Sequence, residues 1–209
     1  MKKSNQIIFI ILLIISSCTN KENKVSTNTT FIGNKNTMIN EKGIGFINFN
    51  SNIDSIYLIQ SKNAKRILVE EDVSWYEYIY YQEDTTKYLY CNMDFESKEI
   101  LEIGTNSDIF ETNEKIKVGS SIDDIFSNYD NFYLLSGEVD EFYFYVPKYR
   151  MKIFMDSLIM KDKYFAEEMV VFTKNNKKTL KEQLFLNSKS SIKEILIISK
   201  IAAKIFEKN

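Results

Sequence analysis

The stretch Glu114-Lys-Ile-Lys-Val-Gly-Ser-Ser-Ile-Asp-Asp-Ile125 decides the fold that we expect for this chain. The alternation of Ile116 and Val118 with lysines indicates the end of a strand. The glycine that follows supplies a turn. Ser120 then caps a helix with Asp123 three positions later, a variant of the capping box with Asp in place of Glu. The sequence therefore predicts a strand that turns into a capped helix, with an apolar face formed by Ile122, Ile125, Phe126 and Tyr129.

The same pattern occurs earlier in the chain. Residues 47–56 and 116–125 begin 69 positions apart and are identical at five of ten positions. In this first copy Ser51 is the expected helix cap, with Asp54 three residues later. The spacing is too long for a solenoid repeat and indicates a duplicated unit of helix and strands. The apolar face of the first helix is formed by Ile53, Ile56 and Tyr57.

Each expected helix is followed by segments with the alternation of strands. They are Trp75–Tyr81, Tyr88–Met93 and Glu99–Ile103 in the first copy, and Glu141–Val146, Met151–Met155 and Ile192–Ile198 in the second. Residues 98–101 and 193–196 both read Lys-Glu-Ile-Leu, so we expect the two copies to end on the same strand. The second copy then contains an insertion at about 157–190, with a short helix predicted at Tyr164–Phe172.

The tail, residues 199–209, is predicted to form an amphipathic helix packed on the sheet. Ile201, Ile205 and Phe206 form its apolar side, opposite three lysines. A helix that lies on a membrane surface is the alternative, but one turn of apolar residues supports it weakly.

These patterns predict an α+β fold, an antiparallel sheet with helices on one face, built from two tandem units. The expected boundaries are 1–17 for a signal peptide, 18–38 for a lipidated N-terminus and flexible tether, and 39–209 for the folded domain. Within that domain the units span about 44–112 and 113–198, followed by the tail.

The strand-to-helix motif resembles a family of exported bacterial domains. The family includes the beta-lactamase-inhibitor-protein-like (BLIP-like) fold and the small outer-membrane-assembly lipoproteins of the BamE/SmpA type. The matching residues are Val118, Gly119, Ser120, Ser121, Asp124 and Ile125. The first copy departs from the pattern, with Asn50 in place of the glycine. The resemblance implies a tandem BLIP-like fold and a protein that binds other proteins and is not an enzyme.

The N-terminus resembles the signal peptides of bacterial lipoproteins. Met1-Lys2-Lys3 precedes nine apolar residues, Ile7–Ile15, and Ser16-Ser17-Cys18 follows. As a helix, nine residues would be only about 14 Å long, whereas the hydrocarbon core of a bilayer is roughly 30 Å thick. The segment is therefore too short to span a membrane and is predicted to be a secretory leader. The resemblance implies that Cys18 becomes the acylated mature N-terminus. An ordinary leader with an incidental cysteine is the alternative.

An acylated Cys18 implies attachment to a membrane through the lipid and a position in the cell envelope. We expect the outer membrane, on its periplasmic or surface side. Residues 19–38 are mostly Thr, Asn, Lys and Ser, which bury too little apolar surface to fold, so they are predicted to be a flexible tether.

Composition excludes several classes of function. The chain has no histidine, which removes Ser-His-Asp and Cys-His catalysis and every imidazole zinc site. Without Lys2 and Lys3 it has 25 basic and 29 acidic residues, a net charge of −4 that is unsuited to nucleic acid. Cys91 alternates with Leu89 and Met93 and is predicted to be a buried, inert thiol. We expect no cofactor and no metal.

The candidate binding site is a tyrosine-rich face of the sheet. Alternation along the strands groups these tyrosines outside the expected core, and tyrosine is enriched in protein interfaces. The alternative is that they are ordinary strand formers, half exposed and paired across strands. The seven residues are Tyr76, Tyr78, Tyr80, Tyr88, Tyr90, Tyr143 and Tyr145.

Two acidic clusters, Glu70-Glu71-Asp72 and Glu138-Val-Asp140-Glu141, lack calcium-loop spacing and are interpreted as solvated turns. The sequence thus favours a lipid-anchored envelope protein that binds a protein partner. A small-molecule or glycan binder is the alternative, and a hydrolase based on carboxylates is the least favoured.

Overall fold

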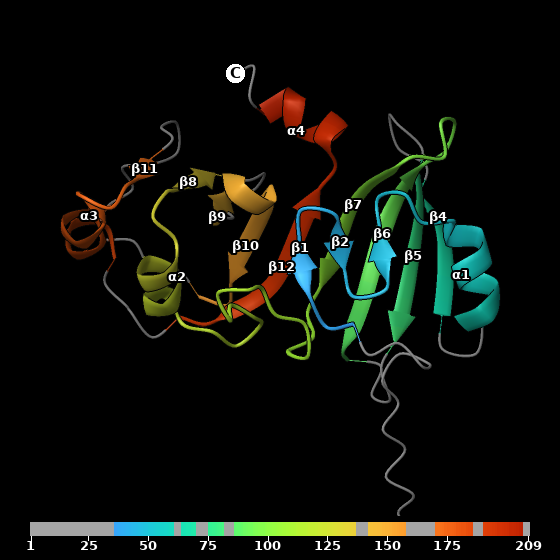
Figure 1. Ribbon diagram of the computed structural model, residues 1–209, viewed down its shortest axis with the longest axis horizontal. Coiled ribbons are helices and arrows are strands. Elements are labelled where there is room, and N and C mark those ends of the chain that lie inside the picture. The colour runs from blue at the N-terminus through green and yellow to red at the C-terminus, as the bar shows by residue number, and fades with distance from the viewer. Residues whose placement is uncertain are drawn as a thin grey trace, which may run out of the picture.

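The computed structural model describes residues 36–60, 64–69, 75–81, 86–136, 142–157, 170–185 and 190–206. The fold is α+β, as predicted, with nine antiparallel strands in one sheet and three in a second, small sheet (Figure 1). The large sheet has the order β11-β8-β9-β10-β12-β7-β6-β5-β4. Its strands are β4 (Ala64–Val69), β5 (Trp75–Tyr81), β6 (Tyr88–Asp94), β7 (Ile100–Thr105), β8 (Phe132–Ser136), β9 (Phe142–Val146), β10 (Met151–Met155), β11 (Val170–Phe172) and β12 (Ile192–Ile198).

The remaining elements are short. The small sheet is formed by β1 (Ile39–Asn40), β2 (Gly43–Ile44) and β3 (Ile47–Asn48). The helices are α1 (Ile53–Gln60), α2 (Ile122–Asn128), α3 (Lys177–Leu184) and α4 (Lys200–Phe206), and a 3-10 turn, η3, spans Pro147–Tyr149.

The large sheet is divided into two similar halves. α1 is followed by β4, β5, β6 and β7, and α2 is followed by β8, β9, β10 and β12. The last strands of the two halves, β7 and β12, pair antiparallel at the centre, with Thr105 opposite Ile195 and Gly104 opposite Leu196. The expectation that both copies end on the same strand is therefore met, and the strand order runs outward from this central pair in mirror sequence.

The insertion in the second half contains elements that the sequence pattern did not predict. β11 adds to the outer edge of β8, and α3 follows it. The predicted helix at Tyr164–Phe172 is wrong for residues 170–172, which are β11; residues 164–169 lie outside the described residues. The outer strands β4 and β8 were also missed, because neither shows strict alternation.

Both helices begin one residue later than predicted. Ser121 is the cap of α2: its hydroxyl accepts a bond from the Asp124 backbone, and the Asp124 carboxylate accepts one from the Ser121 backbone at 2.7 Å. In α1 the corresponding residue is Asn52, whose side chain accepts from the Ser55 backbone at 3.0 Å. Only the turn before α2 needs a glycine, since Gly119 has φ +89°.

The two serines that were predicted as caps have a shared role instead. Ser51 accepts a hydrogen bond from the backbone N–H of Asn48 at 2.9 Å, and Ser120 accepts one from Lys117 at 3.2 Å. Each serine backbone N–H donates to the same residue in return. The repeat seen in the sequence therefore corresponds to a strand-to-helix turn that both copies share. In each copy a serine closes the turn, and the residue after that serine caps the helix.

The core lies on one face of the large sheet, under α1, α2, α3 and the small sheet. The predicted apolar faces of both helices pack into it, and the small sheet contributes Ile39, Ile44 and Ile47. Below α2 the core is aromatic: the rings of Phe132 and Phe172 stack at 4.8 Å, and Phe126 meets both edge-on at 5.1 Å. Cys91 is fully buried in this core, as predicted, and burial raises the pKa of its thiol.

The helices do not all lie on one face, which corrects the prediction. α4 packs on the opposite face of the sheet, where Ala203 is buried against Leu196 and Ile198. The tail is therefore a helix packed on the sheet, and of its expected apolar side Ile201 does not take part in this packing, since it is 54% exposed. Small alanine side chains allow the helix backbone to approach the strands closely.

Candidate functional site

Three of the seven candidate tyrosines do not lie on an open face. Tyr76, Tyr78 and Tyr80 share one side of β5, as alternation predicts, but they pair across strands with Met93, Cys91 and Leu89 on the core side. Tyr78 and Tyr80 are each 1% exposed. The prediction of an open face is therefore wrong for Tyr78 and Tyr80, which α1 and the small sheet cover, whereas Tyr76 is half-buried at the border of the core.

Each of the three has a structural contact instead. The Tyr78 hydroxyl donates to the Asp54 carboxylate at 2.7 Å, which ties β5 to α1, and burial together with this bond raises its pKa to about 12. The ring of Tyr76 lies beneath the cations of Arg66 and Lys98, at 5.4 and 4.8 Å. Tyr80 meets Phe46 edge-on, and among the described residues its buried hydroxyl has no hydrogen-bond partner.

This contrast predicts opposite effects of one substitution at two equally buried positions. Tyr80→Phe removes an unsatisfied buried hydroxyl and is expected to raise the free energy of unfolding by about 1 kcal/mol. Tyr78→Phe removes a bond to a charged group and is expected to lower it by about 1–2 kcal/mol. Urea unfolding of the two variants checks this. A loss of stability in Tyr80→Phe would mean that its hydroxyl is satisfied.

Tyr143 and Tyr145 do project from the face opposite the core, as predicted, yet they are not open either. They are 6% and 7% exposed. Tyr143 packs on Phe154 at 5.4 Å, Tyr145 lies beside Tyr133 at 6.3 Å, and α4 completes this second apolar cluster. The half of the face built from β8, β9, β10 and β12 is therefore closed by its own side chains.

The other half of this face holds a groove, and we take it as the candidate functional site. The groove has a volume of about 560 Å³ and lies over β5 and β6, with one contribution from β12. All of its residues are half-buried. We call it the aromatic groove; it is lined by Trp75, Glu77, Ile79, Tyr81, Tyr88, Tyr90, Asn92 and Glu194.

Strand register explains why these side chains converge. Ile79 lies opposite Tyr90, and Tyr81 opposite Tyr88, all on the side of β5 and β6 that faces away from the core. Cross-strand pairs of aromatic and β-branched residues pack against one another and give a continuous apolar surface. Trp75 and Glu77 belong to the same side of β5 by alternation.

Tyr90 is held in place by two residues from the central strands. Its ring lies over Gly104 in β7, the residue opposite it in register. Its hydroxyl reaches past β7 and donates to the Glu194 carboxylate in β12 at 2.6 Å. Burial raises the pKa of Tyr90 well above its ordinary value, and the charge of Glu194 adds to the effect. This contact joins the two halves of the sheet.

The groove is acidic. Glu77, Asn92 and Glu102 follow one another in register across β5, β6 and β7, and the Asn92 amide nitrogen donates to Glu102 at 3.2 Å. The pKa of Tyr88 is raised by burial and by the nearby charges of Glu194 and Glu77. Both carboxylates therefore act on the same end of the groove.

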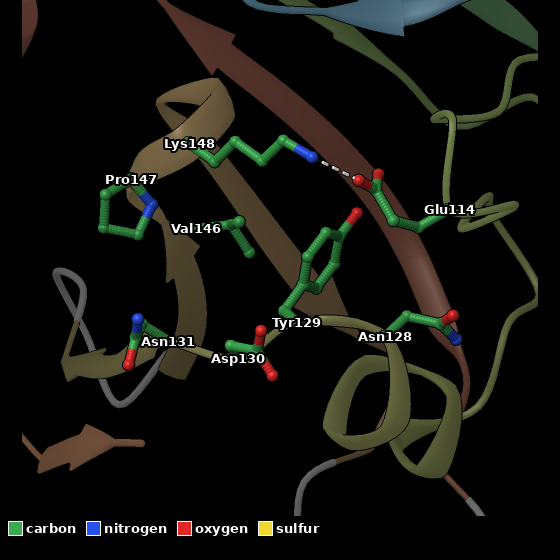
Figure 2. A pocket seen from close by; sticks show the side chains of 8 residues that line it. All are labelled: Glu114, Asn128, Tyr129, Asp130, Asn131, Val146, Pro147 and Lys148. Atoms are coloured by element: carbon green, nitrogen blue, oxygen red, sulfur yellow. Dashed lines mark hydrogen bonds and ion pairs between the residues drawn. The ribbon is translucent and has the colours of Figure 1, made fainter. Parts of the chain in front are cut away.

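A second, smaller pocket of about 280 Å³ lies between the end of α2 and η3 (Figure 2). Two of its charged groups pair with each other: Lys148 donates to Glu114 at 2.5 Å, and the Tyr149 hydroxyl donates to the same carboxylate at 2.6 Å. Burial alone would raise the pKa of Glu114, but these bonds outweigh it and the pKa is lowered. We interpret this pocket as a structural clamp.

Of the seven predicted residues, the structure brings only Tyr88 and Tyr90 into the groove. Sequence reasoning missed Trp75, Ile79 and Tyr81, which alternate with the chosen tyrosines along the same strand. The sequence does indicate them, because residues 75–81 carry large apolar side chains on both sides of the strand.

Other predictions fall outside the described residues: the leader 1–17, the lipidated Cys18, the tether up to residue 35 and the two acidic clusters. The end of the predicted tether, residues 36–38, belongs to the folded domain instead, where Met38 forms a bridge with Glu111. In the described part of the chain, none of the helices combines the length and the apolar character needed to cross a bilayer. The same residues hold no group of three or more Asp, Glu, Cys or His placed to bind a metal ion.

A scan against protein families finds no match for this sequence, and neither does a search of curated proteins. Among solved structures, the fold is similar to the crystal structure of the uncharacterized protein yfeY from Escherichia coli. The two chains share 7% identity, with a TM-score of 0.50 over 78% of this chain and 99% of that one. At this identity the similarity concerns the fold alone.

Proposed function

We propose that this protein is a lipid-anchored, non-enzymatic component of the cell envelope that binds a partner protein through the aromatic groove. The observation that carries the proposal is the groove itself. It places Trp75, Tyr81 and Tyr88 together on the half of the sheet face that α4 leaves uncovered. Aromatic residues with a polar tip give large contact area at a small entropic cost, which suits protein recognition.

Anchoring is supported by the N-terminal sequence. The basic start, the apolar run and Ser16-Ser17-Cys18 are typical of lipoprotein leaders. Each buried methylene of an acyl chain contributes about 0.8 kcal/mol, so several chains on Cys18 would hold the protein at a membrane. Incorporation of labelled palmitate, lost in Cys18→Ala, is the direct test.

The binding proposal predicts a position-specific crosslink. With a photoreactive phenylalanine analogue in place of Tyr81, the full-length, membrane-attached protein is expected to form a discrete covalent product with an envelope protein. The same analogue at Phe95, which is 39% exposed in the turn after β6 and outside the groove, is the control and is expected to form none. Products of equal yield at both positions would contradict a binding role for the groove.

A glycan is the second candidate ligand. Aromatic rings beside carboxylates and an amide, as in Tyr88, Glu77 and Asn92, also suit a sugar with its apolar faces and hydroxyl groups. Thermal unfolding in the presence of a glycan panel separates the two: a rise in the midpoint that disappears in Tyr88→Ala would favour the glycan.

A further inference from the structure

We infer that the aromatic groove recognises an arginine side chain of the partner protein. This inference rests on the proposed function and specifies the chemistry of the ligand. Three independent features of the groove point to it: the sign of its charge, its hydrogen-bonding groups and its aromatic walls.

The first feature is charge. Glu77 and Glu194 line the groove, and none of its eight lining residues is basic. The basic residue that register places beside the groove is Lys65 in β4, opposite Ile79, and it is not one of the lining residues. A half-buried surface that carries carboxylates and no cation of its own favours a positively charged ligand.

The second feature is an excess of hydrogen-bond acceptors. Asn92 donates to Glu102 through its amide nitrogen, while its Oδ1 is buried and has no hydrogen-bond partner among the described residues. Beside it in register lies Glu77, which can only accept when ionised. A ligand that brings several N–H donors would bond to the Glu77 carboxylate, which lines the groove beside this buried oxygen.

The third feature is the aromatic wall. Trp75, Tyr81 and Tyr88 present rings from which a planar cation gains both stacking and cation–π attraction. A guanidinium offers five donors in one plane, whereas a lysine ammonium is a point charge that does not stack.

The test uses Trp75, the only tryptophan of the chain, as an internal probe. Titration of the purified protein with N-acetyl-arginine amide is expected to change the Trp75 emission in a saturable way. N-acetyl-citrulline amide, which has nearly the same shape without the charge, is expected to bind about tenfold more weakly. Equilibrium dialysis with labelled arginine amide confirms that emission reports binding.

Variants locate the site. Glu77→Gln and Glu194→Gln are each expected to weaken arginine-amide binding about tenfold, because each removes one ion pair in a partly buried groove. Glu96→Gln removes the same charge from an exposed turn outside the groove and is the matched control, expected to bind like the natural protein. Circular dichroism verifies that each variant folds. If Glu194→Gln does not fold, arginine-amide binding by Glu77→Gln is the test.

The outcomes separate this inference from the proposed function. Equal binding of citrulline and arginine, or unchanged binding in both groove variants, overturns the inference. A crosslink at Tyr81 without arginine binding overturns it too, while leaving the groove as a protein-binding site of other chemistry. Arginine binding that is lost in the groove variants, without a crosslink at Tyr81, supports the arginine site and counts against the proposed protein partner.

Discussion

Replacing Phe132 with alanine is expected to lower the free energy of unfolding by about 3–5 kcal/mol. The ring is fully buried, stacks on Phe172 at 4.8 Å and meets Phe126 and Phe144 edge-on at 5.1 and 5.6 Å. Removing it leaves a cavity among rings that cannot move together, because each is held by the others. The loss also weakens the attachment of β11, since Phe172 lies opposite Phe132 in register.

Urea unfolding followed by far-ultraviolet circular dichroism measures this loss. Phe95→Ala is the control: this ring is 39% exposed and lies beside the Tyr76 ring and the Lys98 ammonium, so its removal is expected to cost about 1 kcal/mol or less. Similar losses for the two variants would mean that the aromatic cluster under α2 is loosely packed.

Gly104→Ala is expected to destabilise the protein by about 2–4 kcal/mol, an unusual cost for a single methyl group. A Cβ at this position would lie 2.5 Å from Cε1 and Oη of Tyr90. The Tyr90 ring must therefore leave its place over β7, and its bond to Glu194 is lost. The substitution should also alter Trp75 emission, because Tyr90 forms part of the same groove.

A double-mutant cycle isolates the cause. In a Tyr90→Ala background the additional effect of Gly104→Ala is expected to fall to about zero, since no ring occupies the space above the glycine. An undiminished cost in that background would show that Gly104 is needed for its backbone and not for the tyrosine. Urea unfolding of the four proteins provides the measurement.

Much of the architecture was predictable because it depends on local periodicity. Six of the nine strands of the large sheet, both repeat helices and the shared final strand follow from alternation, apolar spacing and the matching segments around Ile53 and Ile122. The helix caps were displaced by one residue because Ser51 and Ser120 have neighbours, Asn52 and Ser121, that cap equally well. Which of the two neighbours caps the helix is decided by the turn. Ser51 and Ser120 close it through hydrogen bonds to Asn48 and Lys117 and are therefore not the caps.

The site was less predictable, because β5 is apolar on both sides. Tyr76, Tyr78 and Tyr80 on one side and Trp75, Ile79 and Tyr81 on the other satisfy alternation equally. Which side becomes core depends on α1 and the small sheet, whose positions are set by tertiary packing. In the same way, α4 closed the face over Tyr143 and Tyr145, a contact between distant segments that no local pattern indicates.

The central pairing of β7 with β12 has a consequence for the order in which the protein folds. During synthesis, all the strands of the first half are present once the chain has passed residue 105. The edge of β7 that pairs with β12 has no partner until residues 192–198 follow. Until then an apolar strand in the middle of the future sheet is an exposed edge, open to pairing with another chain. Until β12 is available, β7 is thus a strand edge through which copies of this chain can pair.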